Sequence, residues 1–391
     1  FYDGQPYRNA KDHLFHPITH PDGLAIKGNR INFATGERTP YDVWVEPYPH
    51  PLAGDQEVLT SGVLRPASYL IFGEESRLPE GSPLIGSGLQ TGDQIVWADG
   101  ERIFSIPQLL ELLNDGRVYV LIERDGKTFS VRVPRVKVRE LAMSPEFQDE
   151  VSDWQFEAKL KGRQRDLYLL AYNLTPDAVV EEAIPLIDRE KQLDRPLEVG
   201  DRILAIDGTP LQQAYQALYQ LQQRRVHVIV QRDPTPKPVV DWVDADRSFE
   251  RGVDAKALQA LASSIGQDQP RHRVDNLVLL NTVTPVTRRE LIQSKEMQAL
   301  EQAKQELAQM EDSDKKSQAL QQVEEHEKQV VLGISGIQDQ QVLFNPTPLE
   351  LFERVYTEIW TTLEALFTGS LNPKWMSGPV GIVQVVQSQW M

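Results

Sequence analysis

The feature that most constrains the fold is a nine-residue segment that occurs twice. Residues 92–100 read Gly-Asp-Gln-Ile-Val-Trp-Ala-Asp-Gly, and residues 200–208 read Gly-Asp-Arg-Ile-Leu-Ala-Ile-Asp-Gly. The copies lie 108 residues apart (200 minus 92), a period that suits one small domain per copy. In each copy Gly-Asp turns the chain into a short apolar strand, and Asp-Gly, which is typical of tight turns, turns it out again. The sequence therefore predicts two similar α+β domains.

The segments around the two copies are also alike. A helical pattern follows each copy, a strand pattern follows each helix, and a short apolar strand precedes each turn. These are the helices 106–113 and 211–221, the strands 117–124 and 226–232, and the upstream strands 68–73 and 166–172. We therefore expect each unit to contain a strand, a turn, a helix and a second strand.

The repeats suggest a division of the whole chain. A third, partial copy at 28–36 has no apolar helix after it and predicts a β-hairpin instead. The segment from Thr287 to Lys328 lacks Gly and Pro and predicts a charged helical hairpin, either a solvated spacer or a partner-binding arm. The expected parts are a β-rich extension at 1–59, repeat domains at 60–137 and 150–235, a connecting segment at 236–286, the helical insertion at 287–328 and a post-repeat segment at 329–391.

Composition excludes several classes of protein. The 391 residues carry 57 acidic and 41 basic side chains, a formal net charge of −16, which argues against a nucleic-acid partner. The absence of cysteine excludes disulfides and thiol catalysis. No apolar run approaches the roughly 18 to 20 residues that cross a bilayer. The first residue is not methionine, and the abrupt ends predict a piece of a longer protein.

Four short segments after the insertion narrow the interpretation. They are Leu-Gly-Ile at 332–334, Pro-Leu-Glu at 348–350, a helical pattern ending in Thr-Gly at 368–369, and Ser-Gly-Pro-Val-Gly-Ile at 377–382. In this order they resemble the region that follows the PDZ pair in the bacterial site-2 protease family, intramembrane zinc metalloproteases of the regulator of sigma-E type. The two repeats themselves resemble bacterial PDZ domains. The resemblance covers 60–235 and 330–391.

The resemblance implies two tandem PDZ domains, which are partly open β-barrels with capping helices, and a C-terminal amphipathic helix. It implies the periplasmic region of a bacterial inner-membrane protein that gates substrates for regulated intramembrane proteolysis. The expected partners are membrane-anchored peptide or protein substrates, the protease's own membrane core and the bilayer surface. The alternative is a free-standing periplasmic tandem-PDZ scaffold or chaperone that binds peptides without proteolysis.

The same resemblance locates the zinc outside this chain. In the family a membrane helix carries His-Glu-x-x-His, in which two histidines bind zinc and the glutamate activates water. The printed sequence lacks this motif, because His326-Glu327 has no second histidine after it. We therefore expect no catalytic residue and no cofactor here, with zinc held by the membrane core of the whole protein.

The resemblance also implies candidate peptide-binding residues. A PDZ domain adds an extended peptide as a strand to a sheet edge, opposite a helix. The expected strand edges are Tyr69, Leu70, Ile71 and Phe72 in the first domain and Tyr168, Leu169 and Leu170 in the second. The expected helical walls are Leu109, Leu112 and Leu113 in the first and Leu218 and Leu221 in the second. The competing interpretation is that these apolar residues only form the cores.

A second set of candidates couples the repeats to the membrane. Aromatic residues favour the bilayer interface, and the Gly-Pro of Ser-Gly-Pro turns the chain and stops a helix. The residues are Trp360, Phe367, Trp375, Ser377, Gly378 and Pro379. Burial of the same rings against the repeats is the alternative.

The clustered histidines His13, His16 and His20 are the remaining candidate metal ligands. Pro17 and Pro21 lie among them, and we expect the prolines to prevent a regular helix from placing all three on one face. Polar loop histidines are the default interpretation, and a zinc site in a loop is the alternative.

Overall fold

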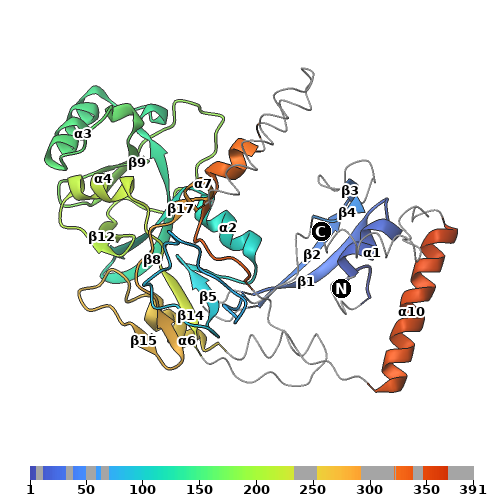
Figure 1. Cartoon of the computed structure of the whole chain (residues 1–391). Helices are drawn as coiled ribbons and strands as arrows, with labels where there is room; N and C mark the ends of the chain where they lie inside the picture. Colours follow the sequence, from blue (N-terminus) through green and yellow to red (C-terminus); the bar gives the residue numbers. More distant parts are fainter. Residues whose placement is uncertain are drawn as a thin grey trace, which may run out of the picture. The chain divides into compact units, whose positions relative to one another are not determined.

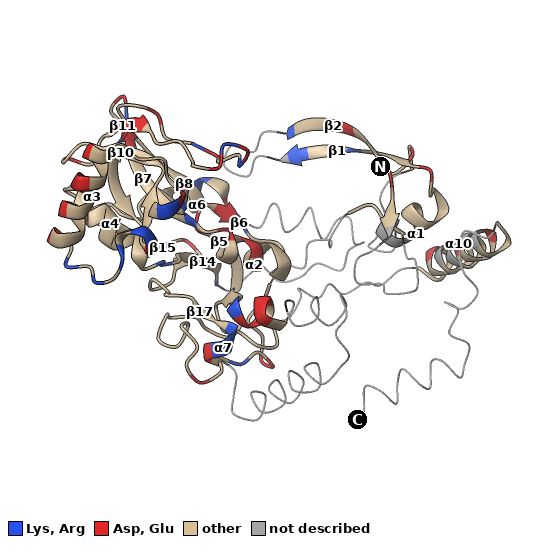
Figure 2. Cartoon of the chain, turned by 90° about the horizontal axis from the view of Figure 1, so that it is seen from above, with Lys and Arg blue, Asp and Glu red and all other residues tan. Residues whose placement is uncertain are grey.

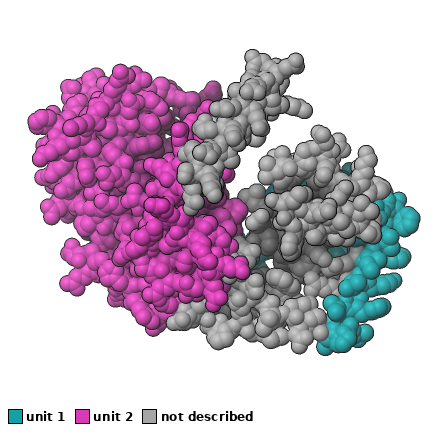
Figure 3. Space-filling view, in the orientation of Figure 1, with its two compact units in different colours: residues 1–67, 236–252, 341–391 teal, residues 68–235, 253–340 magenta. Residues whose placement is uncertain are grey.

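The fold comes from a computed structural model, which describes residues 1–5, 12–31, 38–49, 59–62, 70–232, 253–291, 321, 323–337 and 347–368. The chain divides into two compact units (Figure 3). Unit 1 comprises residues 1–67, 236–252 and 341–391, and unit 2 comprises residues 68–235 and 253–340. The expected mixture of helices and sheets is confirmed (Figure 1).

Unit 1 contains the N-terminal strands and a long C-terminal helix. Its elements are α1 (Asp12–Thr19), β1 (Leu24–Ile31), β2 (Arg38–Val45), β3 (Tyr48–Pro49), β4 (Leu59–Thr60) and α10 (Pro348–Phe367). β1 pairs antiparallel with β2 from Leu24 opposite Val45 to Ile31 opposite Arg38. This pairing confirms the strands expected around 28–36, although their connection lies outside the described residues.

Unit 2 holds both repeats. In chain order its strands and helices are β5 (Gln94–Ala98), β6 (Glu101–Arg102), α2 (Ile106–Asn114), β7 (Arg117–Arg124), β8 (Lys127–Lys137), α3 (Pro145–Glu157), β9 (Tyr168–Leu170), β10 (Tyr172–Leu174), β11 (Val180–Ala183), β12 (Arg202–Ile206), β13 (Thr209–Pro210), α4 (Ala214–Gln222), β14 (Val228–Gln231), α6 (Ala255–Ala262), β15 (Arg273–Val274), β16 (Leu277–Leu279), β17 (Val286–Thr287), α7 (Arg288–Leu291) and β18 (Val330–Val331). Two five-stranded sheets form, in the orders β13-β12-β7-β8-β9 and β15-β16-β14-β5-β6.

The two repeats exchange strands. β12 of the second repeat pairs antiparallel with β7, which follows the helix of the first repeat. Reciprocally, β5 of the first repeat pairs with β14, which follows the helix of the second. The expected unit of strand, turn, helix and second strand is therefore wrong in its last member. Both following strands are almost wholly buried, so their composition suits either partner.

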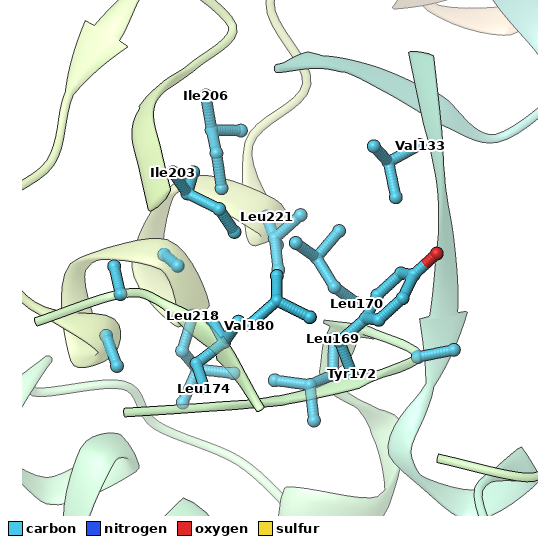
Figure 4. Close-up of a cluster of buried hydrophobic side chains, with 14 of the residues drawn as sticks. Val133, Leu169, Leu170, Tyr172, Leu174, Val180, Ile203, Ile206, Leu218 and Leu221 are labelled. Carbon is cyan, nitrogen blue, oxygen red and sulfur yellow. The ribbon is translucent and has the colours of Figure 1, made fainter. Parts of the chain in front are cut away.

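The exchange produces two separate cores. One contains only residues between Val118 and Leu221, and Val133 of β8 lies there among side chains of β9, β12 and α4 (Figure 4). The sheet of the second repeat therefore includes β7 and β8. The other core joins Leu70, Ile95 and Leu112 to Val228 and Leu332 from the later chain. The first core is thus continuous in sequence and inserted between the two halves of the second. α3 and α4 lie beside each other over the continuous core (Figure 1).

An equivalent ion pair joins each exchanged strand to the repeat that receives it. Arg124 at the end of β7 donates two hydrogen bonds to Asp201, at 2.6 and 2.7 Å. Arg232, just after β14, donates two to Asp93, both at 2.9 Å. Burial alone would raise the pKa of Asp201, but the hydrogen bonds from Arg124 and from the Glu198 N–H hold it below its usual range. Such bidentate pairs fix strand register as well as charge.

The aspartates of the two Asp-Gly turns hold the backbone where the exchanged strands begin. Asp99 Oδ1 accepts from the His227 N–H at 2.8 Å, and Asp207 Oδ1 accepts from the Tyr119 N–H at 2.8 Å. Both aspartates have positive φ, 37° and 43°, a region that Asp tolerates in turns. Both are buried, and Arg224 lies 3.5 Å from Asp99. Each repeat therefore stabilises the strand that the other repeat supplies.

This buried cluster shifts two pKa values in opposite directions. Burial, reinforced by the nearby Asp207, raises the pKa of Asp99 to about 7 against the opposing charges of Arg224 and Arg132. Burial and the charge of Arg225 lower the pKa of His227 to about 4. Between pH 4 and 7 the folded state retains the Asp99 proton that the unfolded chain loses, so Asp99 makes stability fall with rising pH. His227 makes stability rise between pH 4 and 6.5.

We predict that Asp99→Asn changes the pH dependence of stability while keeping the oxygen that accepts from His227. Because the variant loses the ionisation of Asp99, its stability relative to the wild type should increase by about 1.4 kcal/mol per pH unit from about pH 4 to 7 and then level off. Urea unfolding followed by circular dichroism at several pH values measures this. Asp268→Asn, at an exposed site, is the control and should give a constant difference. A constant difference for Asp99→Asn would contradict the prediction.

Candidate functional site: two strand edges beside the last turns of α2 and α4

The clearest candidate site lies where α4 meets β9. Gln222, the last residue of α4, accepts from the Tyr168 N–H through Oε1 at 2.9 Å. Its Nε2 donates to the Tyr168 carbonyl at 2.8 Å. One edge of β9 is already paired with β8, so the side-chain amide of Gln222 occupies backbone groups on the side that faces the helix.

The same arrangement occurs in the other core, between α2 and β18. Asn114, the last residue of α2, accepts from the Val330 N–H at 2.8 Å and donates to the Val330 carbonyl at 2.9 Å. Asn114 and Gln222 are separated by the repeat period (222 minus 114 is 108). The structural counterpart of β9 is therefore β18, which lies 216 residues away from the helix that it joins.

The structure places the upstream apolar segments differently from one another. Ile71 forms a bridge to Gln94, and the Ile95 N–H donates to the Leu70 carbonyl at 2.9 Å. In the other repeat the segment with these bonds is not β9, because the Ile203 N–H donates to the Ala178 carbonyl. Residues 70–72 thus correspond to 178–180, and the sequence comparison of 68–73 with 166–172 is wrong.

Most of the predicted groove residues are core residues. The core whose two halves flank the continuous one in sequence contains Leu70, Leu109, Leu112 and Leu113, and Phe72 is also buried. The continuous core contains Leu169, Leu170, Leu218 and Leu221. Ile71 and Tyr168 are half-buried, and Tyr69 lies outside the described residues. Of these candidates, Tyr168 is the residue whose backbone N–H and carbonyl are hydrogen-bonded to a side-chain amide in the last turn of a helix.

Sequence reasoning missed Asn114, Gln222 and the strand Val330–Val331. The signal that could have found β18 is Leu-Gly-Ile at 332–334, which follows it directly. Gly333 has φ +65° there, and an added Cβ would lie 2.8 Å from Leu291 and 3.0 Å from Ser82 Oγ. A glycine is therefore required at this turn. No comparable motif marks the two terminal amides.

Two cations lie next to the ring of Tyr168. The guanidinium carbon of Arg135 is 4.6 Å from the centre of the Tyr168 ring, and Lys137 Nζ is 5.2 Å from it. Arg135 also donates to the Leu221 carbonyl at 3.0 Å. Burial lowers the pKa of Arg135, but an arginine remains charged at neutral pH. Two cations thus lie beside Tyr168, whereas acidic residues occur along α3 (Figure 2).

The membrane-coupling candidates are only partly described. Trp360 and Phe367 lie on α10 and are exposed, at 60% and 88%. Phe352, Tyr356 and Trp360 form a row, with neighbouring rings 6.5 Å apart. Trp375, Ser377, Gly378 and Pro379 lie outside the described residues. Among the helices that the structure describes, none combines the length and apolarity needed to cross a bilayer.

One group of possible metal ligands lies among the described residues. Asp3, His16 and His20 offer ligand atoms that all lie within 4.8 Å of one another. The expectation that the prolines keep all three histidines from sharing one helical face stays a prediction, although α1 does run through Pro17. A proline removes one backbone hydrogen bond, and the His20 N–H still donates to the His16 carbonyl at 3.0 Å. The side chain of His13 lies outside the described residues.

Two known proteins are similar to this chain over most of its length. No family model matches it. A protein of Chlamydia trachomatis serovar D named "Putative zinc metalloprotease" is 34% identical over 326 residues, which are 83% of this chain and 52% of the relative. A protein of Chlamydia pneumoniae with the same description is 35% identical over 328 residues, with the same shares covered. The chain therefore spans about half the length of these relatives.

An identity of about one third over more than three hundred residues is a relationship of whole folds rather than of one motif. The matched length is also far greater than either repeat alone. The chain belongs to the same family as these two chlamydial proteins, in agreement with its resemblance to the site-2 proteases.

Proposed function

We propose that this chain is the tandem-PDZ region of a zinc metalloprotease, which selects membrane-anchored substrates for intramembrane cleavage. The observation that carries the proposal is the amide that occupies a strand edge in each core. The side-chain amide of Gln or Asn has the same donor and acceptor as a peptide group. Gln222 and Asn114 therefore make the hydrogen bonds that an added peptide strand would make at β9 and β18.

Each site would bind an extended segment of substrate by exchanging one amide for another. The incoming backbone replaces Gln222 at Tyr168, so no buried N–H or carbonyl is left without a partner. Arg135 and Lys137 beside Tyr168 favour a segment with an acidic side chain or a terminal carboxylate. The intramolecular bonds compete with the ligand, which makes each site weak and suited to screening many substrates.

Zinc belongs to the hydrolytic step in this proposal. The relatives are named for zinc, and in a metalloprotease the ion activates the attacking water. The printed chain has no His-Glu-x-x-His, so we assign its residues to substrate selection and not to hydrolysis. A free-standing peptide-binding scaffold would use the same two strand edges. The sequence relationship to about half of two proteins named as zinc metalloproteases favours the protease over the scaffold.

We predict that Gln222→Ala strengthens peptide binding because it removes the competing amide. Two hydrogen bonds of about 1 kcal/mol each correspond to a gain of roughly ten- to thirtyfold in affinity. Fluorescence anisotropy with labelled seven-residue peptides, ending in an apolar residue and a free carboxylate, measures the change. Gln223→Ala, at the exposed neighbouring position, is the matched control and should bind as the wild type does.

Asn114→Ala tests the second edge in the same assay. An unchanged affinity in both Gln222→Ala and Asn114→Ala, with both variants folded, would contradict the proposed edges. In the full-length protein, a change in the rate of cleavage of a membrane-anchored substrate on Gln222→Ala would establish the selecting role. Binding without any effect on cleavage would support the scaffold alternative.

We also propose that α10 lies on the bilayer surface. Its support is the exposed row of Phe352, Tyr356 and Trp360 together with exposed Phe367. We predict that the chain floats with neutral phospholipid vesicles in a density gradient and that Phe352→Ser combined with Trp360→Ser removes most of the floating fraction. The control is Phe156→Ser, at a site on α3 that is 85% exposed. No flotation of the wild-type chain would defeat this part of the proposal.

A further inference from the structure

Three potential metal ligands from two separate segments meet beside the first strand of unit 1. His16 lies in the last turn of α1, and His20 directly follows the helix and donates its N–H to the His16 carbonyl at 3.0 Å. This spacing of four residues places both side chains on the same side. Asp3 comes from a turn that precedes the helix. Its Oδ2 lies 3.9 Å from His20 Nε2, and the ligand atoms of all three residues lie within 4.8 Å of one another.

The carboxylate of Asp3 is fixed by a hydrogen bond to the oxygen that does not face His20. Asp3 has φ 46°, and its Oδ1 accepts from the Ala25 N–H at 2.7 Å. Its own N–H donates to the Ala25 carbonyl at 2.8 Å. These bonds fix the turn to β1 and leave Oδ2 directed at the histidines. In metal sites a ligating carboxylate is commonly hydrogen-bonded through its other oxygen in this way.

The ring of His20 is oriented by its other nitrogen. His20 Nδ1 lies 3.2 Å from the His16 carbonyl and 2.9 Å from Thr19 Oγ1. A carbonyl can only accept, so this contact favours the tautomer with hydrogen on Nδ1. The lone pair is then on Nε2, the atom that faces Asp3. A ligating histidine usually donates its second N–H to a backbone carbonyl, as here.

Stacked rings hold His16. Its ring lies 4.9 Å from the ring of Tyr2 with an angle of 12° between the planes, and 5.9 Å from the ring of His20 at 22°. Tyr2 is buried and forms a bridge to Ile26, so the stack rests on β1. Asp3 is thus bonded to β1, His16 stacks on a residue that is bridged to β1, and His20 contacts His16. These contacts exist before any ion binds, which lowers the cost of ordering the ligands.

We propose that Asp3, His16 and His20 form a binding site for a divalent transition-metal ion of the Zn²⁺ type. Two imidazoles and one carboxylate suit zinc, and ligand atoms about 2.0 to 2.2 Å from the ion lie roughly 3.4 Å apart in tetrahedral geometry. Side-chain adjustments of about 1 Å bring the present spacing to that value. Solvent reaches His20 and Asp3, whose side chains are 46% and 27% exposed, so water can fill the fourth position.

The bound ion would join the segment before α1 to the end of that helix. Because the ligands come from both sides of residues 6–11, the ion would cross-link two segments that the stack of Tyr2 on His16 also brings together. Binding to the folded chain alone raises its stability by mass action. The site is formed by residues of unit 1 and is independent of the two strand edges of unit 2.

The test uses the full chain without a histidine tag, stripped of metal by chelation. Zn²⁺ binding is followed by titration calorimetry, and Co²⁺ binding by the visible absorption that tetrahedral cobalt gives. We expect one ion per chain. Asp3→Asn and His20→Gln each replace an exposed ligand and should weaken binding at least tenfold, and His16→Gln should do the same. His272→Gln, an exposed histidine outside the cluster, is the matched control and should bind as the wild type does.

Thermal unfolding gives the second measurement. Saturating Zn²⁺ should raise the melting temperature of the wild type and of His272→Gln but not that of Asp3→Asn or His20→Gln. Circular dichroism without metal establishes that the variants are folded, and the two exposed positions decide the result should His16→Gln fail to fold. Absence of saturable binding by the wild type, or equal binding by the wild type, Asp3→Asn and His20→Gln, would overturn the proposal and leave only the 3.9 Å contact between Asp3 Oδ2 and His20 Nε2.

Discussion

The arrangement of the two repeats depends on a buried ion pair that occurs twice. Asp93 and Asp201, the aspartates of the two Gly-Asp turns, each receive two hydrogen bonds from an arginine at the end of a strand. Each arginine comes from the strand that follows the other repeat's helix. An unpaired carboxylate at either position would be costly because both aspartates are fully buried. The pair therefore requires the exchanged strand to be present.

Strand exchange places β9 beside α4 and β18 beside α2, and so forms both candidate sites. When β7 joins β12, it carries β8 and β9 into the same sheet, and β9 then lies beside α4. When β14 joins β5, the later chain returns to the first repeat and brings β18 to α2. The two helix-and-strand pairs are alike down to the terminal amide, although one is local in sequence and the other spans more than two hundred residues. A ligand at β9 would act on a sheet that both repeats build.

The sequence predicts the local elements well and their partners poorly. The Gly-Asp and Asp-Gly turns fix β5 and β12 because glycine and aspartate supply the positive φ values there. The helices after them follow from their apolar spacing. The choice of partner for β7 and β14 is not visible in composition, because both strands are buried on both faces. That choice depends on contacts between residues far apart in the sequence, such as Arg124 with Asp201 at 77 positions and Arg232 with Asp93 at 139.

The candidate site was predictable only in part. Tyr168 was named from its position in an apolar strand, and the structure does place its backbone against a helix. Most of its apolar companions are core residues, since the same pattern serves burial and binding. Gln222 and Asn114 carry no sequence signal of their own. The pair His16 and His20 was noticed in the sequence, but Asp3 could join them only through the pairing of Tyr2 and Asp3 with β1.

The strand exchange is the central claim, and disulfide formation tests it most directly. The chain has no cysteine, so two introduced cysteines can form only one intramolecular disulfide. Glu123 and Arg202 are opposite each other across β7 and β12, within the reach of a disulfide, and Glu123→Cys with Arg202→Cys should cross-link under mild oxidation. Gln94→Cys with Glu123→Cys tests the unexchanged alternative and should stay reduced. Mass spectrometry after proteolysis measures both, and cross-linking of the second pair in place of the first would contradict the account.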